Sequence, residues 1–203
     1  MSLSASVVMV KADAMANIGA ILELFEGRPV EAQSVIGWNA VLDALRYPRP
    51  GKPREIVHKA ATLCGGWTVI LDPEMLMITK EAACAALAAE YRAPVFGMVC
   101  QGTSGTYAFS LYDPDLRRAY WIGDGEVFDN RGAPLPQEAG VDLARLFEDG
   151  VLEIMKRVGL DYGDLEKANA FEVWALDESH LVPPATPEPT KPKRPWWRIW
   201  GAA

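Results

Sequence analysis

Residues 95–129 read VFGMVCQGTSGTYAFSLYDPDLRRAYWIGDGEVFD, and this stretch decides the fold class. Four apolar runs in it have the length and composition of strands: 95–101, 106–112, 117–122 and 126–129. They are separated by GTSG, DPDL and GDG, which are turn formers. Within the second run, Tyr107, Phe109 and Leu111 occupy alternate positions, so one face of this strand is expected to lie on a core. The stretch predicts an antiparallel meander with Asp124-Gly125 as a tight hairpin turn.

Apolar periodicity on both sides of this stretch predicts the rest of one domain. Helices are expected over 14–25, 35–46, 54–64, 80–92 and 143–158. Further short strands are expected over 7–10, 67–71 and 171–176. Helices gathered around one antiparallel sheet make an α+β domain, which we place at residues 1–182.

The composition changes after Leu181, where the chain continues VPPATPEPTKPKRPWWRIWGAA with six prolines. Proline lacks an amide donor and favours extended polyproline II, so residues 183–203 are expected to form an extended, semi-rigid tail. This tail has four basic residues and one acidic residue, a net charge of +3. The whole chain has a net charge of −7, so the body of the protein has −10.

The end of the tail combines apolar and basic side chains and is the predicted partner-binding segment: Trp196, Trp197, Ile199 and Trp200 beside Lys193, Arg194 and Arg198. Exposed tryptophans favour docking on another surface. A hydrophobic groove with an acidic rim suits them, on this body, on a second copy or on another protein. An anionic membrane surface is the less favoured alternative, because stable attachment normally needs two full anchors. Docking between copies predicts a homo-oligomer.

Five acidic residues near the expected strand ends form the most concentrated polar candidate site: Asp113, Asp115, Asp124, Glu126 and Asp129. Hard cations need several oxygen ligands from one loop, but Arg117-Arg118 and a strand interrupt this set. Aspartate is also a common turn former. We therefore expect turn chemistry here, and no metal or cofactor.

No candidate catalytic residue in the sequence lies in a recognised catalytic motif. Ser104 lies in Gly-Thr-Ser-Gly between two strands, which lacks the G-x-S-x-G spacing of a nucleophile elbow. His58 and His180 have no sequence neighbours that suggest a triad or a metal site. The side chains of Arg117 and Arg118 are expected to lie in solvent and to pair with nearby acidic residues. No glycine-rich phosphate loop is present.

Charge and targeting signals restrict the class of protein. A net charge of −7 argues against a protein that coats nucleic acid. The start, MSLSASVVMVKADA, lacks the basic region and the long apolar run of a secretory signal. The sequence has three cysteines, Cys64, Cys84 and Cys100, all in apolar surroundings. An odd number in such surroundings indicates reduced, mostly buried thiols. A cytoplasmic location is expected.

The segment AYWIGDGEVFDNRGAPLPQEAG, with the preceding hairpin GTYAFSLYDPDLR, resembles small uncharacterised bacterial α+β proteins. Some of these resemble immunity partners from interbacterial toxin systems. The resemblance covers residues 67–140 and rests on turn patterns, so it assigns no functional residue. It implies a protein-binding role.

Two functional hypotheses follow. The first is a non-enzymatic protein-binding protein, for example an immunity-like inhibitor of a basic toxin, because an acidic body suits a basic partner. The second is a hydrolase-like enzyme with a site assembled from dispersed residues such as Asp113, Arg118, Asp124 and Glu126. A deep pocket with convergent polar groups favours the enzyme, and a flat acidic face favours the binding protein.

Overall fold

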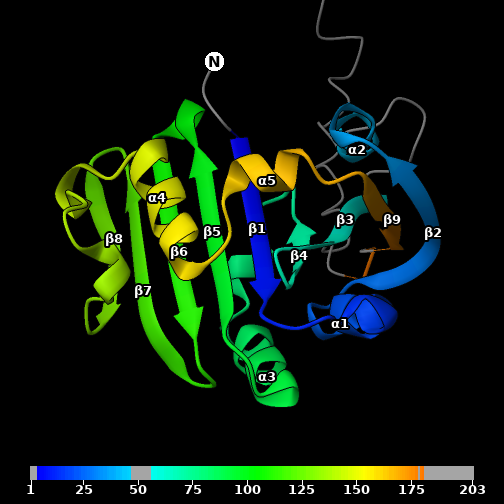
Figure 1. Ribbon diagram of the computed structural model, residues 1–203, viewed down its shortest axis with the longest axis horizontal. Coiled ribbons are helices and arrows are strands. Elements are labelled where there is room, and N and C mark those ends of the chain that lie inside the picture. The colour runs from blue at the N-terminus through cyan, green and yellow to red at the C-terminus, as the bar shows by residue number, and fades with distance from the viewer. Residues whose placement is uncertain (1–3, 47–55, 178, 181–203) are drawn as a thin grey trace, which may run out of the picture.

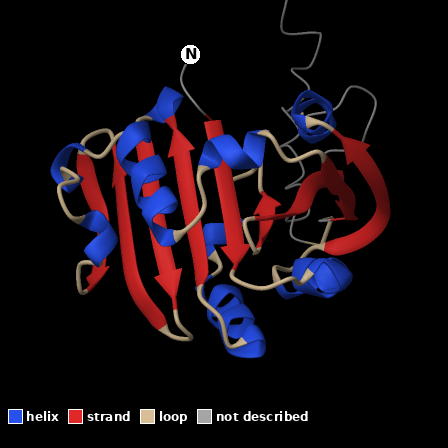
Figure 2. Cartoon of the chain, viewed as in Figure 1, coloured by secondary structure: helices blue, strands red, loops and turns tan. Residues whose placement is uncertain are grey.

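The computed structural model describes residues 4–46, 56–177 and 179–180. Their nine strands form one antiparallel sheet in the order β2-β9-β3-β4-β1-β5-β6-β7-β8 (Figures 1 and 2). The strands are β1 Ser4–Val10, β2 Arg28–Ile36, β3 Ile56–Cys64, β4 Trp67–Leu71, β5 Val95–Gln101, β6 Thr106–Tyr112, β7 Leu116–Gly123, β8 Glu126–Gly132 and β9 Ala170–Asp177. The predicted α+β class with an antiparallel sheet is confirmed, and the predicted tail, 183–203, lies outside the described residues.

The described residues include five α-helices, which pack on the sheet and cover both of its faces. They are α1 Ile18–Leu24, α2 Trp38–Leu45, α3 Glu81–Tyr91, α4 Glu148–Val158 and α5 Tyr162–Glu166. Helices α2, α4 and α5 contribute to one apolar cluster, and α1 and α3 contribute to another. Figure 1 shows α4 and α5 lying across the near face of the sheet. Within the described residues, no helix combines the length and apolarity needed to cross a bilayer.

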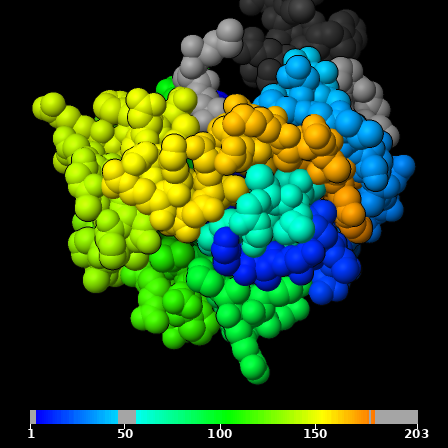
Figure 3. Space-filling model, in the orientation of Figure 1, coloured from blue at the N-terminus to red at the C-terminus, as the bar shows by residue number. Residues whose placement is uncertain are grey.

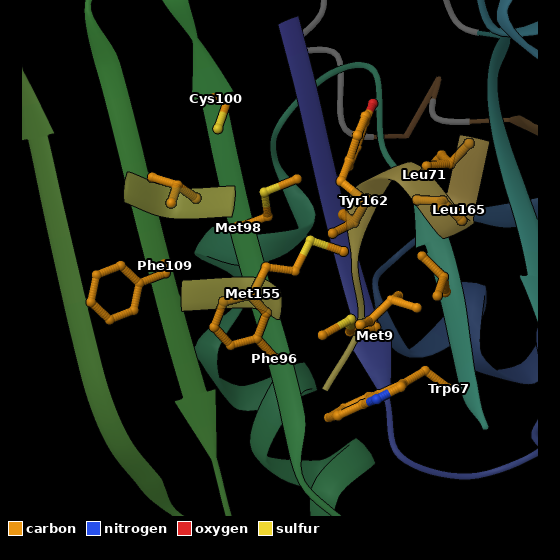
Figure 4. Packing of buried hydrophobic residues seen from close by; sticks show 14 of the residues in the cluster. Met9, Trp67, Leu71, Phe96, Met98, Cys100, Phe109, Met155, Tyr162 and Leu165 are labelled. Carbon is orange, nitrogen blue, oxygen red and sulfur yellow. The ribbon is translucent and has the colours of Figure 1, made fainter. Parts of the chain in front are cut away.

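The central strand β1 explains this arrangement, because both of its faces are apolar. Val7 and Met9 join the first cluster, and Val8 and Val10 join the second. All four are buried. Alternate residues of a strand point to opposite faces, so a continuous apolar run needs cover on both sides. Figure 4 shows the first cluster, in which Met155 of α4 lies beside Phe96 and Met98 of β5.

The predicted meander is confirmed as β5-β6-β7-β8, and β5 and β6 have the expected bounds. Asp124 and Gly125 form its last turn, with φ of 49° and 80°. Positive φ at both positions is the signature of the tight hairpin turn expected there. The expectation that only one face of β6 lies on a core is wrong, because Ala108 and Tyr112 on its other face are also buried.

The helix expected over 54–64 is wrong, since residues 56–64 form strand β3. Gly65 and Gly66 explain the error, because both have positive φ and close a two-residue turn between β3 and β4. In the sequence alone, two consecutive glycines are equally consistent with the C-terminal end of a helix. Pairing with β4 and β9 decides for a strand.

The helix expected over 35–46 is also partly wrong. Residues 28–36 form strand β2, which pairs with β9. Gly37, with φ of 88°, separates this strand from the shorter helix α2. The apolar pattern of 35–46 predicts four inward residues, of which Val41 and Leu45 are buried, but Leu42 is 47% exposed and Ile36 is 81% exposed. The polar composition of β2 gives no alternation, and its partner strand is more than 130 residues away in the sequence.

The remaining helices agree with the apolar periodicity. The period of 14–25 puts five apolar residues on one helical face, and all five are buried: Ala14, Ile18, Ile21, Leu22 and Phe25. Helix α3 lies within the expected 80–92. The helix expected over 143–158 is shorter than predicted. Residues 143–145 form a short helical turn, and α4 follows it, with Gly159 as the C-cap of α4.

The three cysteines are free thiols with different exposure. Cys84 and Cys100 are buried, and burial raises the pKa of each to about 12. Cys64 is half-buried, and its pKa is raised as well. The larger cause is burial, and the smaller is the negative charge of the Asp164 carboxylate. The thiolate is the reactive species, so low accessibility and a raised pKa both slow alkylation.

We expect thiol titration of the native protein at pH 8 to label Cys64 first and to leave Cys84 and Cys100 almost unreacted. Labelling in guanidinium should reveal all three thiols. Fast labelling of all three in the native state, or a disulfide, contradicts this assignment.

Candidate functional site

The five acidic residues predicted as a concentrated set do not lie together. Asp113 and Asp115 lie in the β6-β7 turn, whereas Asp124 and Glu126 lie at the β7-β8 turn. Successive turns of a meander lie at opposite ends of the shared strand, and an eight-residue strand spans about 25 Å. No group of three His, Cys, Asp or Glu residues suited to a metal ion occurs among the described residues.

The fifth acid, Asp129, belongs to an ion network between β8 and α3. Arg131 Nη2 lies 2.6 Å from Asp129 Oδ2 and 2.5 Å from Glu81 Oε1. The hydrogen bond from Arg131 lowers the pKa of both carboxyls. Arg131 therefore links the edge strand to the helix through Glu81, and Asp129 holds Arg131 from within β8, away from the acids of the two turns.

Arg118 is the largest departure from expectation among the candidate residues, because it is buried and not solvated. Its Nε donates to Glu138 Oε1 at 2.7 Å, and its Nη2 donates to Glu138 Oε2 at 3.1 Å. Asn130 Oδ1 accepts from Nη1 at 2.7 Å. The guanidinium carbon lies 5.4 Å from the Tyr120 ring centroid. Every face of this group is occupied, so Arg118 holds the loop after β8 and is not placed to receive a substrate.

The nucleophile and base candidates are also far apart. Ser104 lies in the β5-β6 loop, where its hydroxyl contacts Gln101 and Thr106. His58 lies on β3, and strands β4 and β1 separate β3 from β5. His180 lines a shallow hollow with Glu23, Glu26 and Arg28. The structure does not bring Ser104 together with either histidine.

A buried ion cluster that no sequence pattern indicated lies between β3 and the loop after β4. Lys59 Nζ is 2.6 Å from Asp72 Oδ1 and 2.8 Å from Glu74 Oε2. Asp72 Oδ2 also accepts from the Met77 amide at 2.7 Å. Burial lowers the pKa of Lys59, but the two carboxylates outweigh burial and raise it above its ordinary value. The cluster anchors residues 72–77 to the sheet.

A cavity of about 630 Å³ opens beside this loop, at the start of β1. It has an apolar floor of Trp38, Leu42, Leu45, Leu71 and Tyr162, and polar residues at Ser4, Ser6, Arg46 and Asp72. The buried Ser6 hydroxyl has no hydrogen-bond partner within the described chain. Ser4 and Arg46 border segments outside the described residues, and we assign no ligand to this cavity.

Another hollow, of about 430 Å³, lies between α4 and α5. Part of the excess of acidic residues seen in the composition lines it. Its lining is Glu148, Asp149, Leu152, Glu153, Lys156, Asp161, Tyr162, Gly163 and Glu166. Five carboxylates and one ammonium give this lining a net charge of −4. We call it the acidic groove. Figure 3 shows the segments that form it, in yellow to orange, across the front of the molecule.

Local helix chemistry explains why carboxylates gather in the acidic groove. Glu148 and Asp149 lie in the first turn of α4, where the amide dipoles favour negative charge. Asp161 caps α5 by accepting from the Gly163 amide at 2.9 Å. The hydrogen bond from Lys156 lowers the pKa of Asp161. Asp149 and Glu166, by contrast, form no ion pair within the described residues.

Phe147 adds an apolar contact next to these charges. It precedes α4, and its side chain remains 62% exposed although its ring packs edge-on against Tyr107 at 5.7 Å. An aromatic side chain beside an acidic groove is the kind of arrangement found at protein interfaces. The apolar period of 143–158 includes Phe147 and so predicts an inward side chain, but Phe147 is the N-cap of α4 and lies outside the helical face, so sequence reasoning missed this surface.

The predicted partner-binding residues of the tail, from Lys193 to Trp200, lie outside the described residues. Comparison with known proteins leaves the family open: no protein-family model, no curated protein and no solved structure matches this chain.

Proposed function

We propose that this protein is a non-enzymatic, cytoplasmic binding protein whose partner is a basic protein. The observation that carries the proposal is the acidic groove, with its net charge of −4 beside the exposed Phe147. A negative groove attracts a positive surface over distance and orients it before contact. An exposed aromatic ring then supplies apolar burial once the surfaces meet.

An immunity-like inhibitor of a basic toxin is the concrete form of this proposal. Such an inhibitor needs a preformed, charged surface and no catalytic group. The two acids without ion pairs, Asp149 and Glu166, are available to pair with an incoming lysine or arginine. Close charge pairs across an interface couple by about 1.5–7 kcal/mol in measured cases. These two positions are therefore the most informative to change.

We expect the double charge reversal Asp149→Lys/Glu166→Lys to weaken binding of a basic toxin domain by about ten-fold or more. The measurement is titration calorimetry against basic toxin domains that co-purify with the protein, at low and high salt, together with survival of cells that produce both proteins. Affinity of the unaltered protein should fall as salt rises.

The control is Asp115→Lys/Asp124→Lys, which changes the net charge equally at positions outside the acidic groove. If the control weakens binding as much as the groove variant, the effect is one of overall charge. Protection of cells by the groove variant at the level of the unaltered protein contradicts the proposal.

A further inference from the structure

The segment KRPWWRIW, residues 193–200 of the tail, has no role in the proposed function. It combines three basic residues with three tryptophans and contains no acidic residue. Tryptophan and arginine are enriched at protein interfaces, and basic side chains favour an acidic surface. A site for this segment must therefore be both acidic and partly apolar.

Charge distinguishes the acidic groove from other hollows of the described residues. Its lining has a net charge of −4, which is close in size and opposite in sign to the +3 of residues 193–200. In four other hollows, acidic and basic lining residues balance to within one charge. Asp149 and Glu166 are exposed and form no ion pair within the described chain, so they can receive a lysine or an arginine.

The acidic groove also offers apolar contacts and a hydroxyl that is not used. Leu152 and Tyr162 line it, and Phe147 beside it is 62% exposed. Tyr162, which also lines the neighbouring cavity, is 9% exposed, yet its hydroxyl forms no hydrogen bond within the described residues. Figure 4 shows this hydroxyl pointing away from the apolar cluster. Its oxygen can accept from a tryptophan indole, which is a donor only.

The length of chain before residues 193–200 allows them to reach the groove. Twelve residues, 181–192, connect His180 to Lys193, and five of them are prolines, which favour an extended chain. At about 3.1 Å per residue, they reach about 37 Å. A globular body of this length has a radius of gyration of about 16 Å, so this reach covers much of its surface.

We propose that residues 193–200 occupy the acidic groove of their own chain, with basic side chains on Asp149 and Glu166 and tryptophans on Phe147 and Leu152. The inference rests on the groove of the proposed function, and it adds that a basic partner displaces the tail when it binds. A tethered segment acts at an effective concentration of about millimolar, so weak contacts suffice to hold it. The groove then admits only a partner that binds tightly enough to compete.

Carbodiimide cross-linking of the full chain tests the contact, because the reagent joins a lysine amine to a neighbouring carboxylate. We expect mass spectrometry to find Lys193 joined to Asp149 or Glu166 in a product of single-chain mass, 22.2 kDa. Phe147→Ala should slow this cross-link about three-fold or more, because it removes an apolar contact of the tryptophans. Phe128→Ala on β8, where the side chain is equally exposed, is the matched control and should leave the rate unchanged.

Fluorine NMR of the full chain, labelled with 5-fluorotryptophan, gives a second readout. Trp196, Trp197 and Trp200 should resonate at positions different from those of the free peptide 191–203. The variant Asp149→Asn/Glu166→Gln should move them to the peptide positions. Asp115→Asn/Asp124→Asn, the control, should not. All four acids are exposed, so these substitutions leave the fold intact.

Three results overturn the proposal. The first is a set of tail resonances at the free-peptide positions in the unaltered protein. The second is a groove variant that behaves like its control. The third is a Lys193 cross-link found only in a product of twice the chain mass, which places the tail on a second copy.

The failure of the proposed function gives a different result. The basic toxin domain is added to the labelled full chain, and its binding should move the tail resonances to the free-peptide positions. If the domain binds while these resonances stay in place, the partner uses another surface. The docking of the tail in its own groove then stands, and the proposed function is wrong.

Discussion

Replacing Glu138 by alanine is expected to lower the free energy of unfolding by about 3–5 kcal/mol, which is the usual cost of leaving a buried charge without its partner. Arg118 keeps Asn130 as an acceptor but loses both carboxylate contacts, at 2.7 and 3.1 Å. The Leu135 amide also loses its acceptor on Glu138. Urea denaturation followed by circular dichroism measures the change.

The matched control removes another glutamate that pairs with an arginine. Glu153→Ala breaks a contact of 2.7 Å to Arg157, but both side chains are partly exposed. Solvent screens this pair, so we expect a loss below about 1 kcal/mol. If Glu138→Ala costs no more than Glu153→Ala, the buried pair does not hold the loop after β8.

This prediction also separates two explanations of a variant phenotype. Arg118 is one of the residues from which a dispersed catalytic site was hypothesised. Because its side chain is enclosed by Glu138, Asn130 and two aromatic rings, an Arg118 variant should lose function in proportion to its loss of folded protein. The double variant Arg118→Met/Glu138→Leu removes both charges together and should recover most of the stability.

The second large effect is expected at the other buried ion cluster, where Asp72→Ala should cost about 3–4 kcal/mol. Lys59 keeps Glu74 at 2.8 Å but loses the shorter contact, and the Met77 amide loses its acceptor. Asp164→Ala is the control, because its pair with Lys167 is largely exposed and should contribute less than about 1 kcal/mol.

The pH dependence gives an independent check of the Lys59 cluster. The pKa of Lys59 is raised in the folded protein, so the folded state holds this proton more tightly than the unfolded chain. The stabilisation is fully present below the ordinary lysine pKa and is lost as pH rises through the higher folded value. We expect this alkaline loss of stability to be smaller in Asp72→Ala. An unchanged alkaline slope contradicts the assignment.

The acidic groove was only partly accessible to sequence reasoning. The excess of carboxylates in the body is plain in the composition, and the stripe over 143–158 correctly indicated a helix. The sequence does not show that α5 lies beside α4, so it does not show that Glu166 and Asp149 share one hollow. Proximity in the sequence pointed instead to Asp113 through Asp129, which the meander distributes between two ends of the sheet.

The sequence by itself determined those elements whose shape depends on near neighbours. Turn residues such as Asp124-Gly125 and the apolar stripes of α1 and α4 act within a few residues, so the meander and these helices could be predicted. Tertiary structure alone decided the features that need a distant partner. Strand β2 exists because β9 pairs with it, and residues 56–64 are a strand because β4 and β9 lie on either side. Arg118 and Lys59 are buried because Glu138 and Asp72 meet them there, and only that pairing offsets the cost of removing their charges from water.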